Sequence, residues 1–245
     1  MIQIQNTDIY GWETAIRGMR NPMNSWDKSD SGYGCSEEHN KVCDCCGYDL
    51  CHTTDQFVIG KNDITLMQKL VSSGSDHRKF MHMILVSCDV TAPLYWWKEY
   101  DTYKVGTVAN SCSTMHKIHA KEFTLDDFSH DQLSPGNIGV LQDIICVLNR
   151  EREIYLHGWH GVPGDDAHNV EPHDKRYWWQ MIQLLPSSYN QRRTILLNYE
   201  VLANIYRARK AHKLDEWRYF CQWIETLLYS DLITGGVHND VENRA

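Results

Sequence analysis

The hydrophobic residues of this chain recur at helical spacing along most of its length. The clearest helix follows the capping pair Asn62-Asp63 and stops at Gly74. The β-rich run 83–90 has the length and composition of a strand. The pattern therefore predicts an α/β (α+β) protein, in which helices pack on a modest sheet. Further helices are predicted at 12–20, 93–103, 125–128, 141–148, 178–185, 191–212 and 217–228.

Two stretches show neither the helical nor the strand period of hydrophobic residues. Residues 28–57 are rich in Ser, Gly, Asp, Asn and Cys, and residues 157–175 are rich in Gly, Pro, Asp and His. Such composition is typical of irregular loops. We interpret both as insertions in one domain that spans 1–245, because this length suits a single domain with a substantial core.

The overall charge narrows the range of expected binding partners. The formal net charge of −8 argues against broad, sequence-independent binding to nucleic acid, which depends on Lys and Arg neutralising phosphates. The apolar runs are too short to span a bilayer, and the first residues lack the pattern of a signal peptide. We therefore expect a cytoplasmic protein that has no membrane partner.

Cysteines are concentrated in the first insertion. Five of the nine lie between residues 35 and 51, where Cys43 and Cys46 have a Cys-x-x-Cys spacing. In a reducing compartment such cysteines are either free thiols or metal ligands. One hypothesis is a tetrahedral zinc that organises the loop, bound by Cys35, Cys43, Cys46 and Cys51.

The segment from Asp101 to His116 carries the most specific pattern. With His82, the predicted strand and Pro93 before it, its layout resembles the flavin-dependent thymidylate synthases, the ThyX family. Leu185-Pro186, Asn198 and Arg209 follow at the family's intervals. The family's arginine-rich signature is largely replaced here by uncharged residues, and Glu200 stands where the family has arginine. Because guanidinium groups bind phosphates bidentately, these replacements imply weaker binding of anions.

The resemblance implies a fold, a chemistry and a set of site residues. Family members methylate dUMP with methylenetetrahydrofolate as carbon source and FAD as hydride carrier, use NADPH as reductant, and form homotetramers. Arg209 would orient the pyrimidine and contribute to catalysis. Residues of the signature and of the later element would face the cofactor or hold the substrate. The cofactor set is Thr102, Tyr103, Lys104, Thr107 and Asn198, and the substrate set is Ser111, Ser113, Thr114 and Arg209.

Cys112 is the second candidate catalytic residue. As a thiolate beside a cation it could attack C6 of a pyrimidine, whereas a small thiol that fills a buried helix seam is the alternative. Three hypotheses for function remain open. The protein methylates a pyrimidine nucleotide with a flavin, it is a ThyX scaffold that binds nucleotides without flavin chemistry, or it is a zinc-organised interaction module.

Overall fold

The computed structural model describes residues 2–33, 57–159 and 169–235. These residues form two compact units, and each unit is built from three separate segments of the chain. Unit 1 contains Met1–Gln5, Asp89–Tyr103 and Ala109–Ile195, and unit 2 contains Asn6–Cys88, Lys104–Val108 and Leu196–Ala245. The assignment of the whole chain to one domain stays a prediction. Most of residues 28–57, and about half of 157–175, lie outside the described residues.

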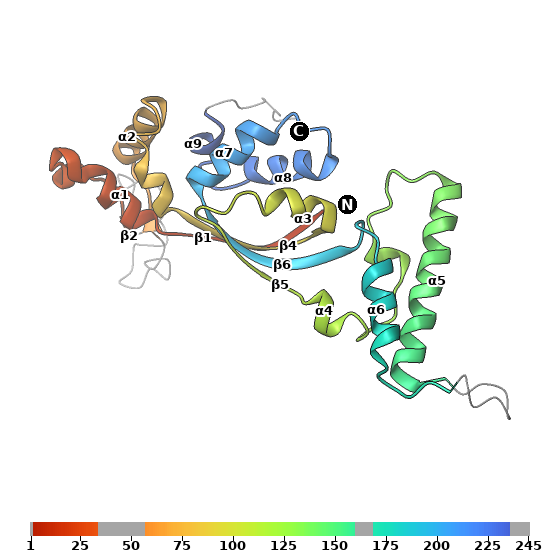
Figure 1. Ribbon diagram of the computed structural model, residues 1–245. Coiled ribbons are helices and arrows are strands. Elements are labelled where there is room, and N and C mark those ends of the chain that lie inside the picture. Colours follow the sequence, from red (N-terminus) through yellow and green to blue (C-terminus); the bar gives the residue numbers. More distant parts are fainter. Residues whose placement is uncertain (1, 34–56, 160–168, 236–245) are drawn as a thin grey trace, which may run out of the picture. The chain divides into compact units, whose positions relative to one another are not determined.

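A four-stranded sheet has the strand order β1-β4-β6-β5. Its members are β1 (Gln3–Tyr10), β4 (Leu85–Pro93), β6 (Asn190–Asn198) and β5 (Val108–Ser111) (Figure 1). The predicted strand at 83–90 is confirmed as β4, displaced by a few residues because a 3-10 helix, η3 (Lys79–Met83), precedes it. In β4 buried side chains alternate with half-buried ones, as expected for a strand with two different faces.

The prediction of one helix over 191–212 is wrong. Residues 190–198 form β6, and helix α7 (Tyr199–Arg209) begins only after them. In β6 the buried Gln191, Ile195 and Leu197 lie two or four residues apart, which is the period of a strand. Because β6 has a neighbouring strand on each side, pairing in the sheet outweighs the helical preference of its leucines.

In unit 2 the core forms around helix α7. This helix contacts η3, α8 (Asp215–Glu225) and α9 (Asp231–Thr234), and α1 (Trp12–Arg20) contacts η3. The indole of Trp12 meets the ring of Tyr199 edge-to-face at 5.3 Å. Short elements complete the unit: η1 (Asn21–Met23), η2 (Trp26–Lys28), the paired strands β2 (Gly32–Tyr33) and β3 (Phe57–Val58), and α2 (Lys61–Ser72).

In unit 1 two helices lie side by side, the long α5 (Pro135–His157) and the shorter α6 (Lys175–Leu184) (Figure 1). Their shared core includes Phe128, Leu148 and Met181, all almost fully buried. The predicted helix 141–148 is the middle of α5, which begins earlier because Ser134 caps it and Pro135 occupies its first turn. The remaining elements are α3 (Leu94–Tyr100), α4 (Thr114–Lys117) and η4 (Leu125–Asp127).

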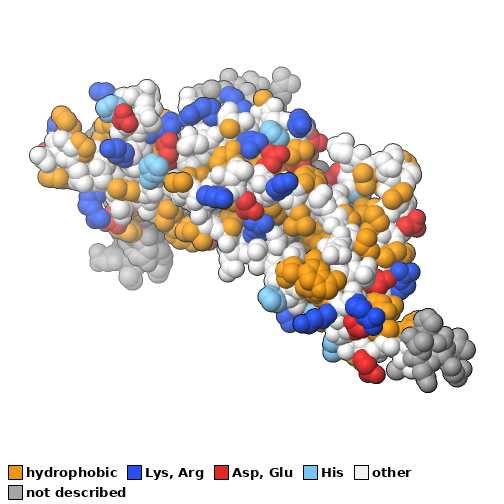
Figure 2. All heavy atoms as spheres, viewed as in Figure 1, with side chains coloured by type: hydrophobic (Ala, Val, Ile, Leu, Met, Phe, Trp, Pro, Cys, Tyr) orange, Lys and Arg blue, Asp and Glu red, His pale blue; other side chains and the backbone are white. Residues whose placement is uncertain are grey.

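Lys and Arg are interspersed with Asp and Glu over the face shown in Figure 2. Across the described ranges, no helix is both long enough and apolar enough to span a bilayer.

Candidate functional site

The predicted cofactor segment begins at the end of α3. Its first residues close that helix, since Thr102 Oγ1 donates to the carbonyl of Glu99 at 2.7 Å and the Tyr103 N–H donates to the carbonyl of Tyr100 at 2.9 Å. Thr102 and Lys104 are exposed, and Tyr103 is half-buried. The segment 101–108 contains a single cation, Lys104.

The second half of that segment lies against the start of α7. Gly106 has a φ of 75°, and a Cβ there would be 2.9 Å from Asn198 Nδ2 and 3.1 Å from Val201 Cγ2. Asn198 is buried and caps α7, because its Oδ1 accepts from the Val201 N–H at 3.0 Å. The structure therefore places two predicted cofactor residues, Thr107 and Asn198, in adjoining segments of unit 2.

Cys112 lines a cavity of about 310 Å³ in unit 1. This cavity, called here the Cys112 cavity, lies where the residues after β5 meet the start of β6. Cys112 is exposed, so the alternative of a buried thiol in a helix seam is wrong. The lining residues are Thr91, Cys112, Ser113, Thr114, Lys121, Asp126, Asp127, Tyr189, Asn190, Gln191 and Arg192.

Hydrogen bonds to β6 fix the position of Cys112. Its N–H donates to the carbonyl of Arg192 at 2.9 Å, and its carbonyl accepts from Gln191 Nε2 at 2.8 Å. Gln191 is itself buried, and its Oε1 accepts from Arg193 Nε at 3.0 Å. The backbone on both sides of the thiol is thus held by a polar network, which suits a preorganised site.

Two predicted substrate residues lie beside Cys112. Ser113 and Thr114 line the cavity, and the Ser113 hydroxyl already accepts from the His116 N–H at 3.0 Å. Ser111, the third, ends β5 and is exposed, but it does not belong to the lining.

The cavity has two cations that the resemblance does not supply. Lys121 pairs with Asp127, and Arg192 Nη2 lies 2.7 Å from Asp89 Oδ2. The side chains of Lys121 and Arg192 are 69% and 50% exposed. Exposed ion pairs are weak, so either cation can turn toward an anion in the cavity. The helical spacing of 191–212 predicted Arg192 on a helix, whereas it is an exposed residue of β6 beside buried Gln191.

Tyr189 and Asn190 supply an aromatic ring and an amide. The Tyr189 ring packs edge-to-face against Phe128 at 5.6 Å. Burial, followed by the neighbouring charges of Asp127 and Cys112, raises the pKa of Tyr189, so that its hydroxyl stays protonated and can donate. Asn190 Oδ1 accepts from Ser129 Oγ at 2.8 Å, which orients the amide.

Arg209, the predicted catalytic arginine, ends α7 in unit 2. Its guanidinium lies 4.7 Å from the ring centre of Trp217, and Nη1 lies 3.1 Å from His212 Nε2. These contacts hold the guanidinium against the side chains of Trp217 and His212. The role of Arg209 toward a pyrimidine stays a prediction.

Glu200, which occupies a position of arginine in the resemblance, forms an ion pair. Its Oε1 accepts from Arg78 Nη2 at 2.8 Å, and both side chains are nearly buried. A guanidinium is therefore present near position 200, but it belongs to Arg78, the residue before η3, and its charge is neutralised by Glu200.

The predicted zinc ligands Cys35, Cys43, Cys46 and Cys51 lie outside the described residues. Within the described ranges, no group of three or more His, Cys, Asp or Glu side chains could hold a metal ion.

Comparison with solved structures identifies the fold. The chain is similar to the flavin-dependent thymidylate synthase ThyX from Helicobacter pylori complexed with FAD and dUMP, with a TM-score of 0.62 and 12% identity over 96% of this chain and 100% of that one. A second structure of ThyX from that organism with FAD and dUMP gives a TM-score of 0.60 and 13% identity over 97% and 100%. The protein thus has a ThyX-like α/β fold, as the resemblance in layout predicts.

Sequence comparison adds no assignment, since neither a protein-family model nor a curated protein matches the chain. The UMP/dUMP methylase PolB from Streptomyces cacaoi, bound with 5-Br dUMP, has a TM-score of 0.49 and 11% identity over 92% of this chain and 89% of that one.

Proposed function

We propose that this protein binds a pyrimidine nucleoside monophosphate of the dUMP type in the Cys112 cavity. The observation that carries the proposal is the composition of this cavity, where a thiol, four hydroxyl-bearing residues, two amides and two exposed cations line about 310 Å³. This volume lies at the lower end of the range for small-ligand sites, which suits a mononucleotide rather than a dinucleotide.

Lys121 and Arg192 provide the charge for the phosphate. Each has an acidic partner in the absence of ligand, and a phosphate can replace that partner with stronger, charge-assisted hydrogen bonds. Because Asp126 and Asp127 also line the cavity, its net charge is near zero. One phosphate is therefore a better match than the two of a diphosphate.

The base is matched by groups at the other lining positions. The amide of Asn190, whose Oδ1 is used by Ser129, has N–H groups to donate to a pyrimidine carbonyl. The protonated hydroxyl of Tyr189 is a second donor. Addition of the Cys112 thiolate to C6 would form an S–C6 bond and shift the C5–C6 electron pair toward the O4 carbonyl, after which C5 takes a proton from solvent.

Titration calorimetry with dUMP tests the binding site. We expect Lys121→Gln and Arg192→Gln each to raise Kd about tenfold, which equals ~1.4 kcal/mol. Lys117→Gln is the matched control, because Lys117 is an exposed cation on α4 outside the cavity lining, and it should leave Kd unchanged. The proposal fails if wild-type protein does not bind dUMP, or if all three variants bind it equally.

Exchange of the C5 hydrogen of dUMP with solvent tests Cys112. Reversible addition at C6 labels C5 with deuterium in D₂O, and this label is measured by mass spectrometry without any cofactor. We expect exchange with wild-type protein and none with Cys112→Ser at unchanged dUMP affinity. Equal exchange in both would remove Cys112 from catalysis and leave the binding proposal standing.

Flavin-dependent methylation of the nucleotide is the second candidate, favoured by the fold shared with ThyX structures that contain FAD and dUMP. FAD would supply hydride chemistry when bound. The predicted cofactor residues fit it poorly, because 101–108 offers one cation to a diphosphate and the Asn198 side chain is used as a helix cap. This candidate function also implies NADPH as the reductant, methylenetetrahydrofolate as the carbon source and a homotetrameric assembly.

The visible spectrum after incubation with FAD and desalting separates the candidates. A retained flavin band with dUMP-dependent oxidation of NADPH would establish the enzyme. A colourless protein that still binds dUMP supports a ThyX scaffold without flavin chemistry. Arg209→Ala in the dUMP titration tests the predicted role of Arg209, and unchanged affinity would remove it from the site.

A further inference from the structure

A larger cavity, of about 580 Å³, lies in unit 2 between α1, the turns η1 and η2, and the strands β2 and β3. None of its described lining residues is shared with the Cys112 cavity. We call it the α1 cavity. Its walls include Glu13, Ile16, Arg17, Trp26, Tyr33 and Phe57.

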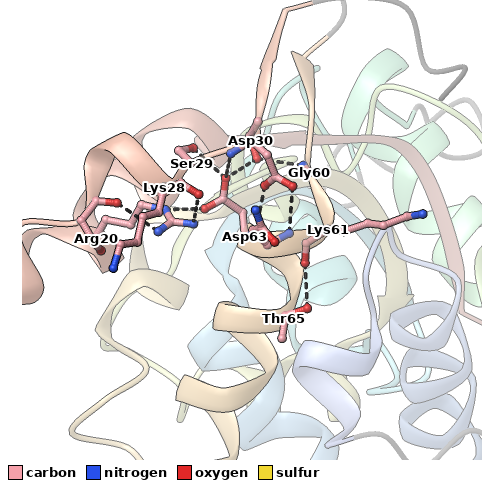
Figure 3. Close-up of polar contacts among 11 residues, drawn as sticks. Arg20, Lys28, Ser29, Asp30, Gly60, Lys61, Asp63 and Thr65 are labelled. Carbon is pink, nitrogen blue, oxygen red and sulfur yellow. Dashed lines mark hydrogen bonds and ion pairs between the residues drawn. The ribbon is translucent and has the colours of Figure 1, made fainter. Parts of the chain in front are cut away.

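A buried ion pair fixes the loop that forms one wall. Arg20 Nε donates to Asp63 Oδ1 at 2.6 Å, and the two other guanidinium nitrogens donate to the carbonyls of Ser25 and Lys28 at 3.1 and 3.0 Å (Figure 3). Asp63 also accepts from the hydroxyl of Ser29 at 2.7 Å. The loop 25–29 is therefore tied at several points to α1 and α2, so the cavity is held in shape before any ligand arrives.

Aromatic rings form much of the surface that faces the cavity. Trp26 is 50% exposed, although its Nε1 donates to Asn21 Oδ1 at 2.8 Å and so fixes the indole. Tyr33 is 63% exposed and meets Phe57 edge-to-face at 5.3 Å. Large aromatic rings left open to solvent around a concave site are typical of ligand pockets.

Two charged residues one helical turn apart define the polarity of the cavity. Glu13 Oε2 accepts from the hydroxyl of Tyr33 at 3.3 Å, so one of its carboxylate oxygens already has a donor. Arg17 is exposed and makes no hydrogen bond or ion pair with another residue of the described ranges. Arg20, the other cation of the lining, is neutralised by Asp63. Among the described lining residues, the guanidinium of Arg17 is therefore the cation that an anionic ligand can reach.

We propose that the α1 cavity binds a small planar aromatic molecule that carries one anionic group. Its ring would lie against Trp26 and the Tyr33–Phe57 pair, and a carboxylate or similar group would accept two hydrogen bonds from Arg17. A cationic ligand would be repelled by Arg17 and would have to share the carboxylate of Glu13 with the Tyr33 hydroxyl. The binding chemistry is thus specific in both shape and charge.

Calorimetry on the full chain with 2-naphthoate and 2-naphthamide tests this proposal. The two probes share one ring system, and only the first is an anion. We expect naphthoate to bind about tenfold more tightly than naphthamide, because the hydrogen bonds from Arg17 are charge-assisted only with the carboxylate. Arg17→Gln should abolish this preference, and Trp26→Ala should weaken both probes.

Arg207→Gln is the matched control, since Arg207 is an exposed arginine on α7 outside the cavity lining and its loss should change neither affinity. Equal thermal unfolding temperatures of the variants show that the exposed substitutions leave the fold intact. The proposal is overturned if wild-type protein binds neither probe, if it does not prefer the anion, or if Arg17→Gln and Trp26→Ala bind naphthoate like the wild type. Dependence of naphthoate affinity on Arg17 and Trp26 together supports it.

Discussion

Replacement of Asp63 by asparagine removes one charge from the interior of unit 2 while keeping the shape of the side chain. Asp63 is fully buried and accepts on both carboxylate oxygens. Oδ1 accepts from Arg20 Nε at 2.6 Å, and Oδ2 accepts from the hydroxyls of Ser29 and Ser31 at 2.7 and 2.6 Å and from the Asp30 N–H at 3.3 Å (Figure 3). Every one of these partners is a donor.

The amide that Asp63→Asn introduces could satisfy only one side of this arrangement. The serine hydroxyls can rotate and accept, whereas Arg20 Nε–H and the Asp30 N–H can only donate. In either orientation the amide NH₂ therefore faces an obligate donor. Arg20, which is 4% exposed, also loses its counter-charge. Breaking a buried pair in this way costs about 3–5 kcal/mol, a large fraction of the ~5–15 kcal/mol that stabilises a typical domain.

Urea unfolding at pH 7, followed by circular dichroism, measures this loss. Asp27→Asn is the matched control, because Asp27 is an exposed residue of η2 in the same loop, and it should change the free energy of unfolding by less than about 0.5 kcal/mol. A loss below about 1 kcal/mol for Asp63→Asn, at an unchanged urea dependence, would refute the reasoning.

The pH dependence gives an independent check. Burial favours the neutral form of Asp63, but the hydrogen bonds from Ser31, Ser29 and Arg20 outweigh it and hold the pKa of this carboxyl below its usual range. A lowered pKa in the folded state contributes stability above the unfolded value of about 4, and this contribution is lost as the pH falls through the folded pKa. Between pH 5 and the acid transition, the wild type should therefore lose more stability than Asp63→Asn.

Two further predictions concern the segments around the candidate sites. Gly106→Ala should destabilise the protein by more than Gly74→Ala, since both positions have a positive φ but only at Gly106 would a Cβ meet other atoms, those of Asn198 and Val201; thermal unfolding measures the difference. Burial, followed by the charge of Glu225, raises the pKa of Cys221 to about 12, so iodoacetamide at pH 8 should modify exposed Cys112 and leave Cys221 unmodified until the chain unfolds, as peptide mapping would show.

Helices whose signals are local were predictable from the sequence. The predicted helix 12–20 coincides with α1. The helices predicted between Asn62-Asp63 and Gly74, at 178–185 and at 217–228 correspond to α2, α6 and α8 within a few residues. In α1, α2 and α6 the apolar spacing is followed by a terminating proline or glycine, and α8 has the apolar spacing alone, so short-range preference and tertiary packing agree. The observed α2 begins at Lys61, one residue before the capping pair that predicted it.

Strands that depend on distant partners were not predictable in the same way. β1 and β5 were not predicted, and β6 was interpreted as helix, because each is a strand by virtue of its neighbours in the sheet. The role of Asp63 was not predictable for the same reason, since it depends on a residue far away in the sequence. The sequence predicts that Asp63 caps a helix, but this is wrong, because α2 begins at Lys61 with Gly60 at its N-cap. Asp63 instead accepts from Arg20, which lies 43 positions away in the sequence and meets it only in the folded chain.

The candidate site shows where a family pattern stops being informative. Cys112, Ser113 and Thr114 of the signature all line one cavity, because residues adjacent in sequence remain adjacent in space. It could not supply the cations, since those of the Cys112 cavity come from Lys121 and Arg192, outside the signature. A scaffold that loses arginines from its motif can regain positive charge from any element that borders the same cavity. Binding assays on Lys121 and Arg192 therefore decide more about function than the degree to which the motif is preserved.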